Sequence, residues 1–320
     1  MAKRLLTFAL IFILVCMTPL AMADSESYKF GFICNGYDNE LFANMLETFQ
    51  ILGKHDGIEV FGGEHRADAN KLLEEAESMI AAGVDVLMFQ YFNHAWAEEV
   101  IKSWKTRGVK VISWGDTSKN ADVNIRLSDY ECGWRIGTMA ADWINENLAD
   151  QDRVEVYIHG HVYEALSLRA DGIEAGLREL CPTAVVVERR DILGAEEPNA
   201  FENALVTYPD IQVVCSINET SCVSICEWWI SELKAKGVDL NRYAGFSVDA
   251  TNSGLALIAA SRYNESIFRG TIDWNIGRLM GTSTVKIWDL VRTLCAGGEA
   301  EDMNIEFYEV TAENISDYGY

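Results

Sequence analysis

Residues 84–114 read VDVLMFQYFNHAWAEEVIKSWKTRGVKVISW and decide the fold class. Val84–Phe89 is a short apolar run with the β-branched and aromatic bias of a strand. Ala95–Arg107 has helical spacing and is followed by Gly108, as helices commonly are. Val109–Trp114 is again a short apolar run. Strand, helix and strand in this order predict a βαβ unit, with parallel strands covered on both faces.

The same alternation continues along the chain in both directions. Before this unit we expect strands at Tyr28–Cys34 and Ile58–Gly62 and helices at Asn39–Gly53 and Ala67–Ala82. After it we expect helices at Tyr130–Glu146, Tyr163–Glu179, Asn199–Val206, Ser221–Lys236, Ser253–Ala260 and Asn275–Cys295, and strands at Arg153–Ile158, Ala184–Arg189, Ile211–Ile217, Tyr243–Val248, Ile267–Ile272 and Ile305–Val310. Two doubly wound rounds predict an α/β protein with two parallel-sheet lobes, since single cores stop growing at about 250–300 residues.

The amino terminus has the pattern of an export signal. Two basic residues precede an apolar run from Leu5 to about Leu20, which ends in Ala21-Met22-Ala23. This order is typical of a secretory signal peptide, so we expect residues 1–23 to be removed by cleavage after Ala23 and the protein to be periplasmic. An uncleaved membrane anchor is the alternative. A lipoprotein cut before Cys16 is disfavoured, because Val15 is not small.

The charge of the chain excludes one class of partner. The formal net charge is -23, and it becomes -25 when the two basic residues of the leader, Lys3 and Arg4, are removed. Such an acidic chain repels nucleic acid, so we expect no nucleic-acid partner. High net charge favours a soluble monomer.

Seven cysteines remain in the mature chain, and an odd number cannot all pair. They lie mostly in apolar segments, where free cysteine packs as a small apolar residue. Cys222 and Cys226 have helical i,i+4 spacing and could form half of a metal site. No second pair at ligand spacing lies nearby, so we expect core packing, no metal and no cofactor.

The candidate ligand residues follow from the fold, because open α/β sheets bind ligands beyond the carboxyl ends of their strands. Polar groups that both donate and accept, set among aromatic rings, suit a ligand made of hydroxyls, such as a sugar or polyol. The polar and aromatic candidates at the predicted strand ends are Tyr37, Asn39, Gln90, Trp114, Asp116, Asn218, Asp249, Asp273 and Trp274, with Trp96 as a further candidate for stacking.

Catalysis and metal binding are the competing interpretations of these segments. Asp116 and Asp249 could be paired catalytic carboxylates, but no nucleophile elbow or Cys–His signature accompanies them, so we expect no catalytic residue and no enzyme. His159 and His161 could be metal ligands or a base. Alternate residues leaving a strand point to opposite faces, which favours a plain loop or cleft role.

Five motifs give the chain a resemblance to a known family. It resembles the periplasmic sugar-binding proteins of the ribose-, galactose- and arabinose-binding kind, the type I solute-binding proteins of ABC importers, over nearly the whole mature length. The motifs are Asn39-Glu40-Leu41-Phe42, Leu127-Ser128-Asp129-Tyr130 with Gly133, Ile136-Gly137 and Ala140-Ala141, Arg169-Ala170-Asp171-Gly172, Ile217-Asn218-Glu219, and Gly245-Phe246-Ser247-Val248-Asp249.

The resemblance implies a hinged binding protein with an ABC permease as its membrane partner. It implies lobes of residues 24–128 plus 273–306 and 129–272 plus 307–320, which close on the ligand by hinge motion. It adds Phe42 and Arg169 to the expected ligand residues, with Asp171 as the alternative to Arg169.

The motifs also depart from the family pattern. Gly115-Asp116 stands for an Asp-Arg pair, Asn218-Glu219 for Asn-Asp, and two extra residues precede Asp249. A nucleoside or a cationic ligand such as an amino sugar therefore stays open as the ligand, and a sensor subunit for a chemoreceptor or kinase stays open as the role.

Overall fold

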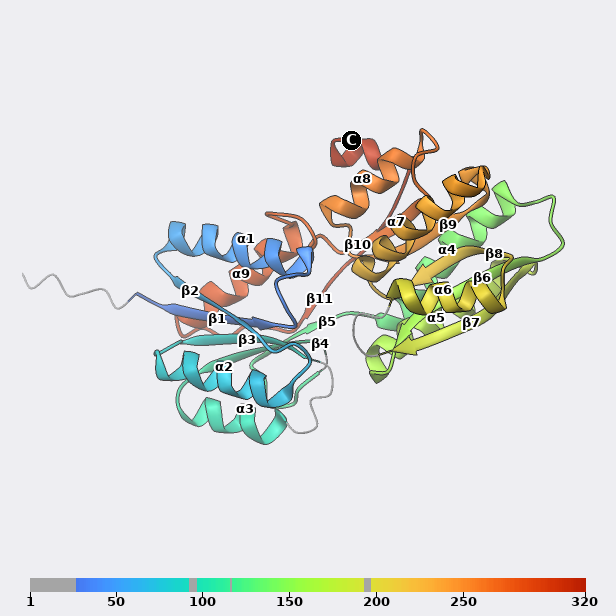
Figure 1. The fold of residues 1–320 in the computed structure, drawn as a ribbon. Helices are drawn as coiled ribbons and strands as arrows, with labels where there is room; N and C mark the ends of the chain where they lie inside the picture. Colours follow the sequence, from blue (N-terminus) through green and yellow to red (C-terminus); the bar gives the residue numbers. More distant parts are fainter. Residues whose placement is uncertain (1–26, 92–96, 116, 193–196) are drawn as a thin grey trace, which may run out of the picture.

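The computed structural model describes residues 27–91, 97–115, 117–192 and 197–320, and the predicted leader lies outside them. These residues form two α/β lobes, each built on a six-stranded sheet (Figure 1). The first sheet has the order β11-β5-β4-β3-β1-β2, with every neighbouring pair parallel. Its strands are β1 (Lys29–Cys34), β2 (Glu59–Glu64), β3 (Val86–Tyr91), β4 (Lys110–Gly115), β5 (Val123–Arg126) and β11 (Met303–Asn304).

The second sheet repeats the doubly wound pattern with the order β12-β10-β9-β8-β6-β7. Its neighbours are parallel except for β12, which runs antiparallel to β10. Its strands are β6 (Val154–His161), β7 (Ala184–Ile192), β8 (Ile211–Ser216), β9 (Ala244–Val248), β10 (Phe268–Asp273) and β12 (Tyr308–Thr311). Two parallel sheets in two lobes confirm the predicted fold class.

Helices cover both faces of each sheet (Figure 1). In the first lobe α1 (Glu40–Asp56) and α9 (Thr282–Cys295) lie on one face, and α2 (Ala69–Ala81) and α3 (Ala97–Thr106) on the other. The helices of the second lobe are α4 (Asp129–Asn147), α5 (Glu164–Leu180), α6 (Glu197–Thr207), α7 (Glu219–Lys236) and α8 (Asn252–Ser261). Because parallel strands and helices alternate, the helix starts gather at the carboxyl edge of each sheet.

Two predicted elements differ from the structure. The helix expected from Asn275 begins only at Thr282. Asn275 and Met280 adopt left-handed backbone conformations, with φ of 56° and 59°, which a helix cannot include. In place of the single strand expected at Ile305–Val310, the structure has β11 at Met303–Asn304 and β12 at Tyr308–Thr311, because the chain passes from the first sheet to the second between them. The short strand β5 was not predicted.

Glycines bring α4 and α5 together backbone to backbone. A Cβ on Gly133 would lie 1.8 Å from the carbonyl oxygen of Arg169, and one on Gly172 would lie 2.1 Å from the carbonyl oxygen of Tyr130. Gly137 meets α5 in the same way. Two of the five motifs that carry the family resemblance, those of α4 and α5, are therefore the two halves of one close helix contact, which brings Arg169 next to the start of α4.

The seven cysteines of the described chain are free and buried, as predicted for core packing. Cys222 and Cys226 lie on the face of α7 that packs against Gly245, where a Cβ would come within 2.4 Å of the Cys226 sulfur. Within the described residues, no group of three or more His, Cys, Asp and Glu side chains is placed to hold a metal ion. None of the described helices is long and apolar enough to cross a membrane.

Candidate functional site

A buried ion pair forms the centre of the candidate site in the second lobe. The guanidinium of Arg169 donates from Nε to Oδ1 of Asp129 at 3.1 Å and from Nη2 to the same oxygen. Its Nη1 donates to the carbonyl oxygen of Ile217. Arg169 is 4% exposed; burial opposes its charge, but Asp129, Cys132 and Asp249 together outweigh this and raise the pKa of Arg169. The charge of this arginine is thus already balanced by the protein.

Trp274 and Asp249 extend this cluster from the ends of β10 and β9. The guanidinium of Arg169 lies over the Trp274 ring, 4.9 Å from its centroid, in a cation–π contact. The indole Nε1 of Trp274 donates to Oδ1 of Asp249 at 3.2 Å. Burial raises the pKa of Asp249 to about 6, although Arg169 acts in the opposite direction. Three predicted ligand residues thus come together with Asp129.

A second buried carboxyl, that of Glu219, holds the segment next to Asp249 in place. The backbone N–H of Glu219 donates to Oδ2 of Asp249 at 3.3 Å. The Glu219 carboxyl accepts from Thr251 N at 2.7 Å, from Thr251 Oγ1 at 2.5 Å and from Thr271 Oγ1 at 2.7 Å. These bonds hold the turn at Asp249 and Ala250, whose φ values of 130° and 50° are strained for residues with a side chain. Burial raises the pKa of Glu219 to about 8.

The first lobe contributes two buried polar atoms, on Gln90 and Trp114. The Oε1 atom of Gln90 and the Nε1 atom of Trp114 have no hydrogen-bond partner among the described residues. Both side chains are at most 5% exposed and lie at the carboxyl ends of β3 and β4. Phe42 packs against the Trp114 ring edge to face, with centroids 5.8 Å apart. Buried polar atoms are normally satisfied, so these two mark a place where a polar ligand would gain contacts.

Three other predicted ligand residues form hydrogen bonds with nearby backbone groups. Asn39 caps α1 by accepting from Leu41 N, and Asn218 caps α7 by accepting from Ser221 N. The hydroxyl of Tyr37 donates to the carbonyl oxygen of Phe32 at 3.1 Å.

Asp273 is engaged in the segment that leaves β10. It accepts from Asn275 N at 2.6 Å and from Arg278 Nη2 at 3.0 Å, so its carboxylate holds this segment in place. Asp116 and Trp96 lie outside the described residues.

The two candidates on α5 lie in different surroundings. Asp171 is half exposed and pairs with Arg189 at the surface, whereas Arg169 is buried in the cluster. His159 and His161 both lie in β6, and His159 is buried with its Nδ1 unpartnered among the described residues. Burial lowers the pKa of His159 to about 4, so the ring is neutral at pH 7.

The structure adds two residues to the site that the sequence did not identify as ligand residues, Asp129 and Glu219. Asp129 was part of the Leu-Ser-Asp-Tyr motif and Glu219 part of the Asn-Glu pair. A carboxylate at a helix start next to an arginine on a glycine-bearing helix was the available signal for Asp129. For Glu219 no local signal exists, because its partners Thr251 and Thr271 come from two other segments.

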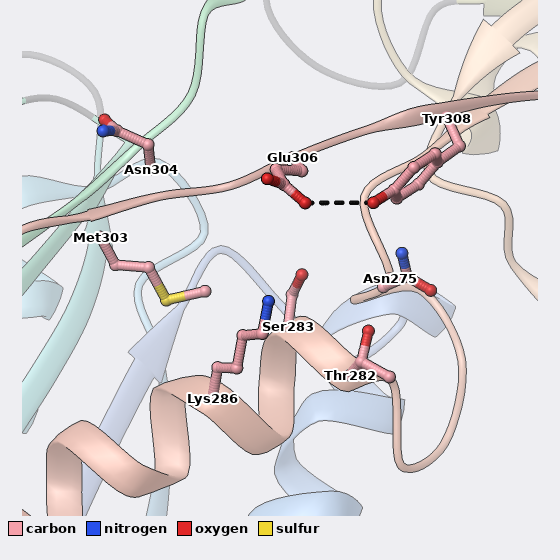
Figure 2. Close-up of a pocket in the computed structure, with 8 residues that line it drawn as sticks. All are labelled: Asn275, Thr282, Ser283, Lys286, Met303, Asn304, Glu306 and Tyr308. Carbon is pink, nitrogen blue, oxygen red and sulfur yellow. Dashed lines mark hydrogen bonds between the residues drawn. The ribbon is translucent and has the colours of Figure 1, made fainter.

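A hollow of about 200 Å³ lies where the chain crosses between the lobes (Figure 2). Its walls are the crossing segment from β11 to β12 and the start of α9, and Lys286 reaches into it without an ion pair among the described residues. The Tyr308 hydroxyl donates to Glu306 at 3.1 Å on one side. None of the predicted ligand residues lines the hollow; the lining residues are Asn275, Thr282, Ser283, Lys286, Met303, Asn304, Glu306 and Tyr308.

Comparison with known protein families decides the identity. Residues 30–291 match the model of the periplasmic binding protein domain. The chain belongs to this family. Periplasmic binding proteins are substrate-binding transport proteins, which confirms the predicted family and the prediction that the chain is not an enzyme. The family also implies a location outside the cytoplasm.

Individual relatives share the fold at low sequence identity. The chain is 21% identical over 210 residues to the ribose import binding protein of Bacillus subtilis (strain 168), covering 65% of this chain and 68% of that protein. It is similar to a solute-binding protein of an ABC transporter from Bacillus halodurans C-125 with bound myo-inositol (TM-score 0.73, 19% identity, 92% and 98% of the two chains). It is also similar to a carbohydrate transporter solute-binding protein from Agrobacterium radiobacter in complex with D-arabinose (TM-score 0.74, 16% identity, 92% and 98%).

Proposed function

We propose that the protein is the extracytoplasmic sugar- or polyol-binding component of an ABC importer and binds its ligand between the two lobes. The observation that carries this is that polar groups lie at the carboxyl edges of both sheets, one group in each lobe. The second lobe offers the cluster of Arg169, Asp249 and Trp274, and the first offers polar atoms on Gln90 and Trp114 that have no partner among the described residues. The carboxyl ends of β5 and β10 lead directly into the opposite lobe, so these edges face each other (Figure 1).

The electrostatics of the cluster favour a neutral ligand. Arg169 is already paired with Asp129, so it offers little net charge to an anion. The raised pKa of Glu219, about 8, makes this carboxyl mostly neutral at pH 7 and so removes one negative charge, whereas Asp249, with a pKa of about 6, stays mostly ionised beside Arg169. Hydroxyls, which both donate and accept, match such a set of groups. The relatives named above are described with ribose, myo-inositol and D-arabinose, which is the same class of ligand.

The finer parts of the proposal follow the sequence predictions. The leader is cleaved after Ala23, the lobes comprise 24–128 plus 273–306 and 129–272 plus 307–320, and the protein works as a periplasmic monomer that delivers its ligand to a membrane permease. The proposed ligand residues are Tyr37, Asn39, Phe42, Gln90, Trp114, Asp116, Arg169, Asn218, Asp249, Asp273 and Trp274, with Asp129 added from the structure.

A thermal-shift screen of residues 24–320 against sugars, polyols, amino sugars, nucleosides and amino acids tests the ligand class. A ligand present at a hundred times its dissociation constant stabilises the folded state by about 2.7 kcal/mol. We expect a hit with a sugar or polyol that is recovered chemically unchanged. A hit confined to nucleosides or cationic compounds would overturn the ligand class. Transport stimulated by the protein in vesicles carrying the permease would separate import from sensing.

A further inference from the structure

One face of α1 carries three polar side chains that all bond to distant segments. Glu40, Asn44 and Thr48 are spaced four residues apart, so they lie on one stripe of the helix. Their partners lie more than 200 residues away in the sequence, at the start of α8 and in the segment after β10. The stripe is therefore the contact surface between α1 and the chain that comes from the second lobe.

Glu40 makes a direct contact between the lobes. Its Oε1 accepts from the backbone N–H of Asn252 at 3.0 Å, and its Oε2 accepts from the N–H of Ser253 at 3.3 Å and from the Ser253 hydroxyl at 2.7 Å. These are the first two residues of α8, whose N–H groups have no acceptor within the helix. A carboxylate is favoured at this position by the helix dipole. Burial opposes the charge of Glu40, but the bonds from Ser253 and Asn252 lower its pKa.

The second contact of the stripe leads to the proposed ligand site. The side-chain amide of Asn44 donates to the carbonyl oxygen of Gly277 at 2.8 Å. Gly277 in turn lies against the backbone of Asp249, where a Cβ on the glycine would come within 2.0 Å of the Asp249 carbonyl oxygen. The turn that carries Asp249 immediately precedes α8, which Glu40 contacts. The stripe on α1 and the turn that carries Asp249 are thus connected by direct contacts.

We propose that Glu40 is an interlobe positioning residue, whose carboxylate at the start of α8 holds the lobes in the arrangement that binds ligand and so sets the affinity without touching the ligand. The affinity part of this inference rests on the proposed function, whereas the interlobe contact stands without it. Only interactions that differ between the open and closed forms shift their populations, and this bond joins one lobe directly to the other. The apparent affinity falls in proportion to the fraction of molecules in the competent arrangement.

The contact is tested first without any ligand, by hydrogen exchange and small-angle X-ray scattering of Glu40→Ala. Glu47→Ala is the matched control, since Glu47 is an exposed glutamate of the same helix with no side-chain partner among the described residues. We expect the amides of Asn252 and Ser253 to exchange about ten-fold faster in Glu40→Ala and the radius of gyration to rise, with no change in Glu47→Ala. Equal exchange and equal scattering in the two variants would overturn the proposal.

Affinity is measured next, with myo-inositol and D-arabinose as the probes. We expect Glu40→Ala and Ser253→Ala each to weaken binding by about three- to ten-fold, because each removes charge-assisted hydrogen bonds at a partly exposed position. The double variant should bind about as weakly as Glu40→Ala alone, since both changes remove one interaction. Unchanged affinity in Glu40→Ala would overturn the positioning role. If the wild type bound neither probe nor any other sugar, the proposed function would fail, while the exchange experiment would still decide the interlobe contact.

Discussion

Glu219→Gln should remove a pH dependence of stability that this buried carboxyl creates. Glu219 is 1% exposed, and burial raises its pKa from 4.5 to about 8 in the folded protein. Between pH 5 and 7 the folded state therefore holds a proton that the unfolded state has lost, so stability falls as the pH rises. Glutamine has the same shape and stays neutral: its oxygen can accept from Thr251 N and its amide can donate to Thr271 Oγ1.

The magnitude follows from one proton. Each pH unit at which the folded state holds one extra proton changes the free energy of unfolding by about 1.4 kcal/mol, so Glu219 should account for a loss of about 2–3 kcal/mol between pH 5 and 7. Asp249 acts with the same sign between about pH 4 and 6, because its pKa is also raised. His65 and His159 act with the opposite sign, since burial lowers both pKa values to about 4. The difference between variant and wild type isolates Glu219.

Urea titrations at pH 5, 6 and 7 measure this difference. The unfolding free energy of Glu219→Gln should gain on the wild type by about 1.4 kcal/mol for each pH unit upward, at an unchanged m value. Glu47→Gln, an exposed glutamate on α1, should follow the wild type at all three pH values. Parallel pH profiles for Glu219→Gln and wild type would refute the reasoning, because they would mean that Glu219 is ionised in the folded protein at pH 5–7.

Three further substitutions test the site and its support. Arg169→Met should lower the unfolding free energy, measured by urea titration, by about 3–5 kcal/mol, because it leaves the Asp129 carboxylate buried and unpaired. Adding Asp129→Asn should recover much of this loss, and no recovery would contradict the pairing. Gly133→Ala should lower the unfolding free energy by about 2 kcal/mol or more, as measured by thermal melting, because the added methyl group forces α4 and α5 apart. This cost exceeds the gain of about 1 kcal/mol in helix propensity, and a stabilised variant would show that the helices are farther apart. Trp274→Phe keeps a ring beneath Arg169 but removes the donor to Asp249, so it should lower the unfolding free energy by about 1–2 kcal/mol in urea titrations. An unchanged unfolding free energy would mean that this hydrogen bond does not contribute to stability.

The sequence predicted most elements of the fold because their period is local. Alternating apolar runs and amphipathic helices identify the two doubly wound rounds without knowledge of tertiary contacts. The errors occur where the chain crosses between lobes. Met280 carries no sequence mark of a left-handed conformation, and Asn275, although asparagine favours it, fits a helix start equally well. The apolar residues of Ile305–Val310 continue across the point where the chain changes sheets.

The candidate site was only partly predictable, for a different physical reason. A polar residue at the end of a strand is equally suited to binding a ligand and to capping the next helix, because both uses need an acceptor at a helix start. The sequence does not distinguish them, and in the structure Asn39 and Asn218 are caps. The pairing of Asp129 with Arg169 spans 40 residues and depends on the close approach of α4 and α5.

The two sides of the proposed site differ in how far their polar groups are already satisfied. In the second lobe Arg169, Asp249 and Trp274 bond to one another and to the backbone, so this side is organised before any ligand arrives. In the first lobe Gln90 and Trp114 keep buried polar atoms without partners among the described residues. Closure is driven only by interactions that are stronger in the closed form. Under the proposed function, the second lobe therefore orients the ligand, and the unpartnered atoms of the first lobe supply the gain that closes the hinge.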